Sequence, residues 1–96
     1  MHQTLTKEQK EALFSAILKL ENLDECEAFF EDVCTINELM AMAQRYEIAR
    51  LLYEGATFHE VEKTTGASST TISRVSRCLK YGQGYLTVLK RLEDTV

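Results

Sequence analysis

The sequence predicts an all-α fold of six helices. Apolar residues recur at spacings of three and four in each long segment, which is the period of an amphipathic helix. Residues that favour helix ends separate these segments. The chain contains no proline, and no stretch shows a convincing strand pattern. Its 96 residues suit a single domain over 1–96, either a monomer or one subunit of an interlocked oligomer.

The first two helices are expected in the acidic N-terminal third. The first, over residues 7–21, follows Thr6 and Gln9, which have the spacing of a capping box. The second, over residues 24–34, begins with an aspartate three positions before Glu27, which repeats that pattern. Their apolar stripes consist of Leu13, Phe14, Ile17 and Leu18 in the first helix, and of Phe29, Phe30 and Val33 in the second.

The third helix is expected over residues 35–54, from the capping pair Thr35 and Glu38 to the stop at Gly55. Its apolar residues are Leu39, Met40, Met42, Ala43, Tyr46, Ile48, Ala49, Leu51 and Leu52. They cover two sides of the helix, so burial on two sides is expected. A chain of this size offers few partners for that, which favours cover from a second subunit. An ordinary core helix in a monomer remains the alternative.

A helix-turn-helix is expected over about residues 57–81, with its turn at Gly66 and Ala67. Glycine can adopt the left-handed backbone that ends one helix. Ser68 or Ser69 can then cap the next helix. The inward side is expected to hold Val61, Thr65, Ala67, Ile72, Val75 and Leu79. A last helix follows the glycines at 82 and 84 and is expected to end near residue 94.

The outward side of the second of these helices carries short hydroxyls and long cations. These residues are Ser68, Ser69, Thr70, Ser73, Arg74 and Arg77. Hydroxyls and guanidinium groups at helical spacing suit contacts with base edges and phosphates in a DNA groove. The alternative is that the serines and threonines are only turn and cap material.

The charge distribution supports nucleic-acid binding although the net charge is −4. Residues 1–62 contain thirteen acidic and five basic residues. Residues 63–91 contain six basic residues and no acidic residue. The six are Lys63, Arg74, Arg77, Lys80, Lys90 and Arg91. Phosphate contact depends on this local field, because salt screens more distant charge. Simple solvation of a helix surface is the alternative.

Several function classes find no support in the sequence. Cys26, Cys34 and Cys78 have no metal-site spacing and are expected to be buried thiols in a reducing compartment. No metal site, nucleophile with a neighbouring histidine, or glycine-rich phosphate loop is recognisable, so no enzyme is expected. No apolar run could cross a bilayer and no leader begins the chain, which indicates a cytoplasmic protein.

Three segments resemble the Trp repressor family, and more closely its YerC/YecD branch in Gram-positive bacteria. They are the T-x-x-E start at 35–38, QRYEIARLLYEG at 44–55 and TGASSTTISRVSRCLK at 65–80. The resemblance implies an intertwined helical dimer. It also implies that Ser69, Thr70, Ser73 and Arg74 lie where the family contacts operator DNA.

The family's best-known member binds tryptophan as corepressor between the third and fifth helices. The resemblance places Thr35, Arg45, Ile48 and Arg74 at positions that line this pocket. Val75 stands where a glycine lies close to the indole, and Cys78 replaces a hydroxyl that helps to place the ligand. Tryptophan is therefore not expected to be the ligand, and no cofactor is expected. A binder without corepressor and one with a different effector both remain open.

The expected function is thus a homodimeric transcriptional regulator, acting as a repressor, whose partner is a double-stranded DNA operator. Its DNA-binding residues are expected to be Lys63, Ser68, Ser69, Thr70, Ser73, Arg74, Arg77 and Lys80. Val75 and Cys78 belong to the possible effector pocket. The alternative is a helical protein-interaction module that keeps the helix-turn-helix only as a scaffold.

Overall fold

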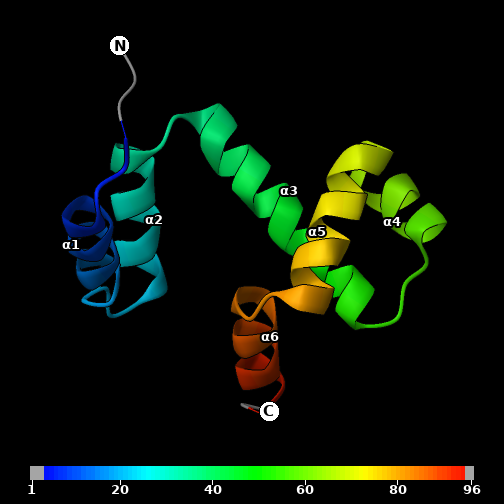
Figure 1. Cartoon of the computed structure of the whole chain (residues 1–96). Helices are drawn as coiled ribbons and strands as arrows, with labels where there is room; N and C mark the ends of the chain where they lie inside the picture. Colours follow the sequence, from blue (N-terminus) through cyan, green and yellow to red (C-terminus); the bar gives the residue numbers. More distant parts are fainter. Residues whose placement is uncertain (1–3, 95–96) are drawn as a thin grey trace. The chain divides into compact units, whose positions relative to one another are not determined.

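The chain consists of helices in the computed structural model, which describes residues 4–94 (Figure 1). The helices are α1 (Lys7–Ile17), α2 (Leu23–Val33), α3 (Ile36–Tyr53), α4 (Phe58–Thr65), α5 (Ser69–Tyr81) and α6 (Gly84–Asp94). Residues 4–94 contain no strand. The all-α class and the six helices are therefore confirmed.

The chain divides into two compact units, Met1–Ile36 and Asn37–Val96. The first unit contains α1 and α2. The second contains nearly all of α3, together with α4, α5 and α6. The predicted helix-turn-helix is formed by α4 and α5, so it lies entirely within the second unit.

Helix α1 begins as predicted and ends earlier. Its capping box is present, because the N–H of Gln9 donates to Thr6 Oγ1 at 3.0 Å and the N–H of Thr6 donates to Gln9 Oε1 at 3.1 Å. The helix ends at Ile17, and the predicted end at residue 21 was wrong. The N–H of Lys19 donates to the carbonyl of Ala16. Bonds of this tighter i→i+3 type close the last turn and stop the α-helical ladder.

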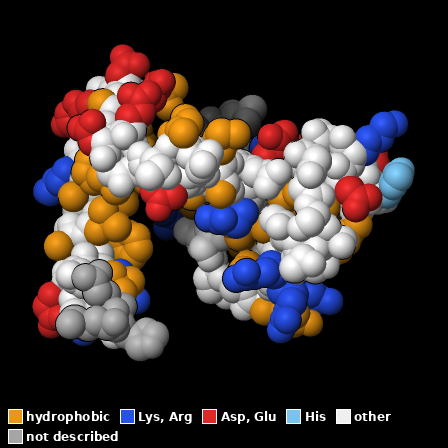
Figure 2. Space-filling view, turned by 90° about the horizontal axis from the view of Figure 1, so that it is seen from above, with side chains coloured by type: hydrophobic (Ala, Val, Ile, Leu, Met, Phe, Trp, Pro, Cys, Tyr) orange, Lys and Arg blue, Asp and Glu red, His pale blue; other side chains and the backbone are white. Residues whose placement is uncertain are grey.

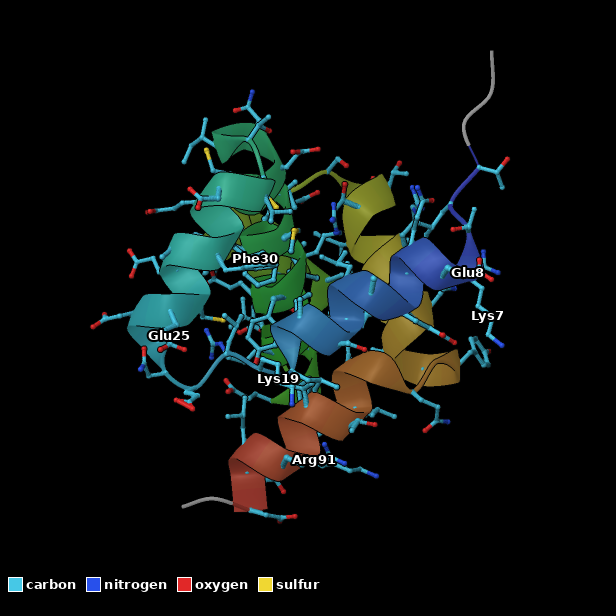
Figure 3. All side chains as sticks on the ribbon, turned by 90° about the vertical axis from the view of Figure 1, so that its left-hand side faces the viewer. Lys7, Glu8, Lys19, Glu25, Phe30 and Arg91 are labelled. Atoms are coloured by element: carbon cyan, nitrogen blue, oxygen red, sulfur yellow. The ribbon has the colours of Figure 1, made fainter. Side chains whose placement is uncertain are left out.

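The cap of α2 also differs from the prediction. Asn22 is the N-cap, and its side chain accepts the N–H of Glu25 at 2.9 Å. The Glu25 carboxylate accepts the N–H of Glu21 at 3.0 Å, and Figure 3 shows Glu25 on α2. The capping box predicted at Asp24 and Glu27 was therefore wrong. The pair at 22 and 25 has the same spacing two residues earlier, and it uses asparagine, an equally good cap.

Neither α1 nor α2 contains a buried residue. Phe29 and Phe30 are half-buried and contact each other edge to face, with ring centroids 5.6 Å apart. Leu18 and Leu23 are 83% and 81% exposed, and Val33 is exposed as well. Much of the apolar side of each of these two helices is therefore exposed.

The second unit contains the buried core. Its members are Ile48 and Ala49 of α3, Val61 of α4, Ala67 of the turn, Ile72 and Val75 of α5, and Leu89 of α6. Each helix of this unit contributes at least one side chain. The core thus fixes the helix-turn-helix against α3 and α6.

Helix α3 ends at Tyr53, one residue before the predicted end at residue 54, and Gly55 supplies the stop as predicted. Gly55 has a φ of 101°, in the region that favours glycine. Its N–H donates to the carbonyl of Leu52 at 3.1 Å, and the N–H of Ala56 donates to that of Leu51 at 3.0 Å. This pair of bonds is a Schellman motif, which satisfies carbonyls that the helix end would leave free.

Helix α4 begins with a capping box that the sequence analysis missed. The N–H of Glu60 donates to Thr57 Oγ1 at 3.1 Å, and the N–H of Thr57 donates to the Glu60 carboxylate at 2.8 Å. This bond from the Thr57 backbone lowers the pKa of Glu60 below its ordinary value. The T-x-x-E pattern at 57–60 was the available signal.

We predict that Glu60→Ala destabilises the protein at neutral pH but not in strong acid. Because the pKa of Glu60 is lowered on folding, its stabilisation is present above the ordinary pKa of 4.5. It is lost as the pH falls through the lower folded-state pKa. Urea unfolding at pH 7 and at decreasing pH should show the variant's deficit shrinking. Glu62→Ala on the same helix is the control, and an equal deficit in both variants at every pH would contradict the role of the cap.

Candidate nucleic-acid interface

The turn between α4 and α5 is built on Gly66. Its φ of 71° is left-handed, and its N–H donates to the carbonyl of Glu62 at 2.9 Å. No heavy atom lies within 4 Å of a Cβ built at this position, so the backbone conformation is what selects glycine. The turn therefore requires a left-handed φ at position 66, and the glycine predicted there adopts it.

Thr65 braces the turn from inside. Its Oγ1 donates to the carbonyl of Val61 at 2.7 Å and accepts the N–H of Ala67 at 3.2 Å. The side-chain amide of Gln44, on α3, donates to the carbonyl of Thr65 at 3.3 Å. The last turn of α4 is thus attached both to itself and to α3, which sets the direction in which α5 leaves.

Ser68 is the N-cap of α5, which decides between the two candidate serines. Its Oγ accepts the N–H of Thr71 at 3.2 Å and lies 3.0 Å from Thr71 Oγ1. The Ser68 hydroxyl therefore already has partners within the chain. Within residues 4–94, the hydroxyl of Ser69, the first residue of the helix, has no hydrogen-bond partner, so it is available to a ligand.

Helix α5 has two distinct sides. Ile72 and Val75 point into the core, with 1% and 2% exposure. The side chains that the sequence analysis assigned to DNA are all exposed: Lys63, Ser68, Ser69, Thr70, Ser73, Arg74, Arg77 and Lys80. Within residues 4–94, neither Arg74 nor Arg77 takes part in a hydrogen bond or an ion pair. The polar side of α5 is thus free to bind.

The electrostatic character of this surface is basic. The first turn of α5 has no acidic residue, and Lys80 lies in its last turn. The Lys80 Nζ lies 5.5 Å from the centroid of the Tyr81 ring, within cation–π range. Figure 2 shows a group of Lys and Arg side chains interrupted by hydrophobic side chains rather than by Asp or Glu. Such a surface attracts polyanions.

A cavity of about 280 Å³ lies beside α5 on the side of α3. Its lining consists of Arg45, Thr71, Arg74, Val75, Cys78 and Tyr85. Four of the residues that the resemblance assigned to an effector pocket thus meet here. Ile48 does not line the cavity, because it is fully buried in the core. Thr35 belongs to the other compact unit and is likewise not part of this lining.

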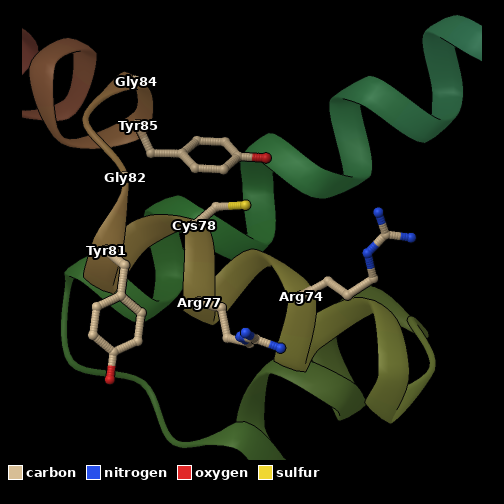
Figure 4. A pocket seen from close by; sticks show the side chains of 7 residues that line it. All are labelled: Arg74, Arg77, Cys78, Tyr81, Gly82, Gly84 and Tyr85. Carbon is tan, nitrogen blue, oxygen red and sulfur yellow. The ribbon is translucent and has the colours of Figure 1, made fainter.

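A larger cavity, of about 650 Å³, lies between the end of α5 and the start of α6 (Figure 4). Arg74, Arg77 and Cys78 line it from α5. Its other lining residues were not assigned to any site from sequence: Tyr81, Gly82, Gly84 and Tyr85. The two glycines gave only a loop signal, and packing of α6 against α5 is what makes the pocket.

The cysteines differ from expectation in their burial. Cys78 is exposed, and Cys26 and Cys34 are half-buried. The prediction of three buried thiols was therefore wrong, because position 78 faces the two cavities instead of the core. All three are free thiols. Residues 4–94 contain no group of His, Cys, Asp and Glu that could hold a metal ion.

Comparison with known proteins places this geometry in a family. The sequence model of the Trp repressor protein matches residues 8–93. The chain belongs to the Trp repressor family. It is 51% identical over 92 residues to the uncharacterized protein YerC of Bacillus subtilis (strain 168), covering 95% of this chain and 88% of YerC. It is therefore a YerC-type Trp repressor-like protein.

Two solved structures share the Trp repressor-like fold. A TrpR-like protein from Eubacterium eligens ATCC 27750 is 51% identical and superposes with a TM-score of 0.87, covering 93% of both chains. A candidate Trp repressor from Staphylococcus aureus is 42% identical, also with a TM-score of 0.87, covering 93% of this chain and 90% of that one. The family membership that the segments at 35–38, 44–55 and 65–80 predicted is thus confirmed.

We predict that Gly66→Ala destabilises this Trp repressor-like protein by about 1–2 kcal/mol, the cost of a left-handed residue with a Cβ. Gly84→Ala is the control, because Gly84 has no left-handed φ and a Cβ there meets nothing within 4 Å. The free energy of unfolding from urea titration measures both. Equal stability of the two variants would contradict the backbone requirement at Gly66.

Proposed function

We propose that this protein is a sequence-specific DNA-binding transcriptional regulator that acts as a homodimer and represses its target. The main observation in support of this function is the exposed side of α5. Within residues 4–94, it presents hydroxyls and guanidinium groups without an ion-pair partner, from a helix that the turn at Gly66 and the core hold in place. Membership of the Trp repressor family supports the same function.

In the proposed complex, α5 enters the major groove with its N-terminal half. Ser69, Thr70 and Ser73 contact base edges or phosphates, since hydroxyls can donate to or accept from either. Arg74 contacts a guanine or a phosphate. The remaining cations, Arg77, Lys80 and Lys63, contact phosphates. Lys63 suits this role from the last turn of α4, immediately before the turn.

The dimer is supported by apolar surface that the single chain leaves uncovered. Helices α1 and α2 bury no residue. On α3, Ile36 and Met40 are 71% and 62% exposed. A second copy would cover such surface, as burial of apolar area is the main driving force of association. A two-fold dimer would then place its two α5 helices in grooves about one helical turn apart.

DNA binding is proposed to need no tryptophan. Val75 is 2% exposed and lines the smaller cavity. Its isopropyl group therefore occupies space that the indole ring of tryptophan would need. Cys78 offers only a weak hydrogen-bond donor in the same lining.

Within residues 4–94, no helix is long and apolar enough to cross a lipid bilayer.

We predict that Arg74→Ala weakens binding to a selected operator by about 1–3 kcal/mol, the cost of losing an arginine contact to a base. Fluorescence anisotropy with a labelled duplex measures the affinity. Arg50→Ala is the matched control. Arg50 lies on α3 and pairs with Glu54 at 3.1 Å and Glu47 at 3.8 Å, and such exposed pairs contribute little. If both variants bound as tightly as the wild type, the role of Arg74 would be refuted.

The proposed dimer predicts a particle of about twice the 11.0 kDa chain mass in sedimentation equilibrium at micromolar concentration. Met40→Glu should shift the protein toward the monomer, because dimer formation would bury an unpaired carboxylate. Lys90→Glu, an exposed charge reversal on α6, is the control. A wild-type protein that sediments as a monomer at these concentrations would contradict the dimer.

A further inference from the structure

The larger cavity, between α5 and α6, has the size of a small-molecule site. Its volume of about 650 Å³ lies in the range of about 300–1,000 Å³ typical of ligand pockets. It shares Arg74, Cys78 and Tyr85 with the smaller cavity, whereas Arg77, Tyr81, Gly82 and Gly84 line only the larger one. The proposed DNA contacts involve only two of its seven lining residues, Arg74 and Arg77.

The lining of this pocket is cationic. Arg74 and Arg77 both belong to it, and none of its seven lining residues is acidic. Within residues 4–94, neither arginine has an ion-pair partner. Arg74 and Arg77 lie three positions apart on α5, and each guanidinium group can hold a phosphate or carboxylate with charge-assisted hydrogen bonds. The charge of this lining therefore favours an anionic ligand.

The start of α6 adds to this positive field. Gly84 is the first residue of the helix and lines the pocket. The N–H of Thr87 donates to the carbonyl of Gln83 at 2.9 Å and begins the intrahelical ladder. The first turn contains no acidic side chain to offset the helix dipole.

Two tyrosines and two glycines complete the lining of the pocket. Tyr81 is 74% exposed and Tyr85 is half-buried, and their rings lie on different sides of the pocket (Figure 4). Gly82 permits the close approach of the chain, because a Cβ there would lie 2.6 Å from the carbonyl oxygen of Cys78. A Cβ at Gly84 would meet nothing within 4 Å, so this position opens onto free space. Aromatic walls favour a ligand with a planar ring.

We propose that this pocket binds a small aromatic phosphate monoester, and that its binding releases the protein from DNA. The phosphate engages Arg74 and Arg77 while the ring lies against Tyr81 or Tyr85. Release follows because the ligand neutralises two cations that the proposed function assigns to DNA. The second half of this proposal rests on the proposed function, and the first half does not.

The pocket is tested by titrating phenyl phosphate into the DNA-free protein, followed by isothermal calorimetry. Gly84→Val places a branched side chain in the pocket without meeting protein atoms near its Cβ. Thr87→Val places the same side chain on the same helix outside the lining and serves as the control. Thermal unfolding checks that both variants fold. We expect wild type and Thr87→Val to bind equally and Gly84→Val to bind at least about tenfold more weakly. No binding to the wild type, or equal binding to all three, overturns the proposal.

Release is tested by operator affinity with and without saturating phenyl phosphate, at an ionic strength held constant with chloride. We expect the wild type to bind operator at least about fivefold more weakly with phenyl phosphate than without it. This is the lower end of the effect of losing one arginine contact to a base. Gly84→Val should bind operator as the wild type does and not respond. Binding of phenyl phosphate without this loss refutes release, and an equal loss with inorganic phosphate refutes selection of the ring. Failure of the untreated protein to bind DNA refutes the proposed function alone, since the calorimetric titration still decides the pocket.

Discussion

The packing of Val61, Ile72 and Val75 against Ile48 of α3 is the interaction on which the functional surface depends. These four side chains have 0–2% exposure, and each contributes about 1.5–3 kcal/mol on burial. Together they hold α4 and α5 at one angle to each other and to α3. The polar side of α5 points outward because its apolar side packs into this core. The turn at Gly66 and the brace at Thr65 fit the same arrangement, so local and tertiary preferences agree.

Features of this fold that depend on neighbouring residues could be predicted from the sequence. The left-handed positions Gly55 and Gly66 follow from local backbone sterics, and the Thr6 cap from a local hydrogen bond. The end of α1 could not be predicted, because the apolar residues Leu18 and Leu20 continue the helical pattern beyond the point where the ladder stops.

In the candidate site, too, the features that depend on local sequence could be predicted and those that depend on packing could not. The exposed side of α5 follows from helical spacing alone, so its residues could be chosen before the structure was known. The pocket between α5 and α6 could not, because Tyr85 and Gly84 reach Arg77 only once α6 packs back on α5. Ile48 matched a pocket position by resemblance, yet it faces the core. Resemblance assigns a position, and the packing around that position decides whether it faces a ligand.

Arg74 links the two kinds of chemistry proposed for this protein. It lies on the exposed side of α5 and in the lining of both cavities. A guanidinium group in this place can contact DNA or a bound anion, and the two uses compete. This arrangement differs in sign from a corepressor, which would strengthen DNA binding. The family fold would thus be kept while the direction of the response to a ligand is reversed.

The proposed function requires that the exposed side of α5 selects a DNA sequence without tryptophan. Selection from random duplex DNA by the purified protein, with and without L-tryptophan, tests this most directly. We expect enrichment of the same palindromic site in both conditions, with half-sites about one helical turn apart. Enrichment only with tryptophan would contradict the inference from Val75 and Cys78. No enrichment in either condition would contradict sequence-specific DNA binding itself.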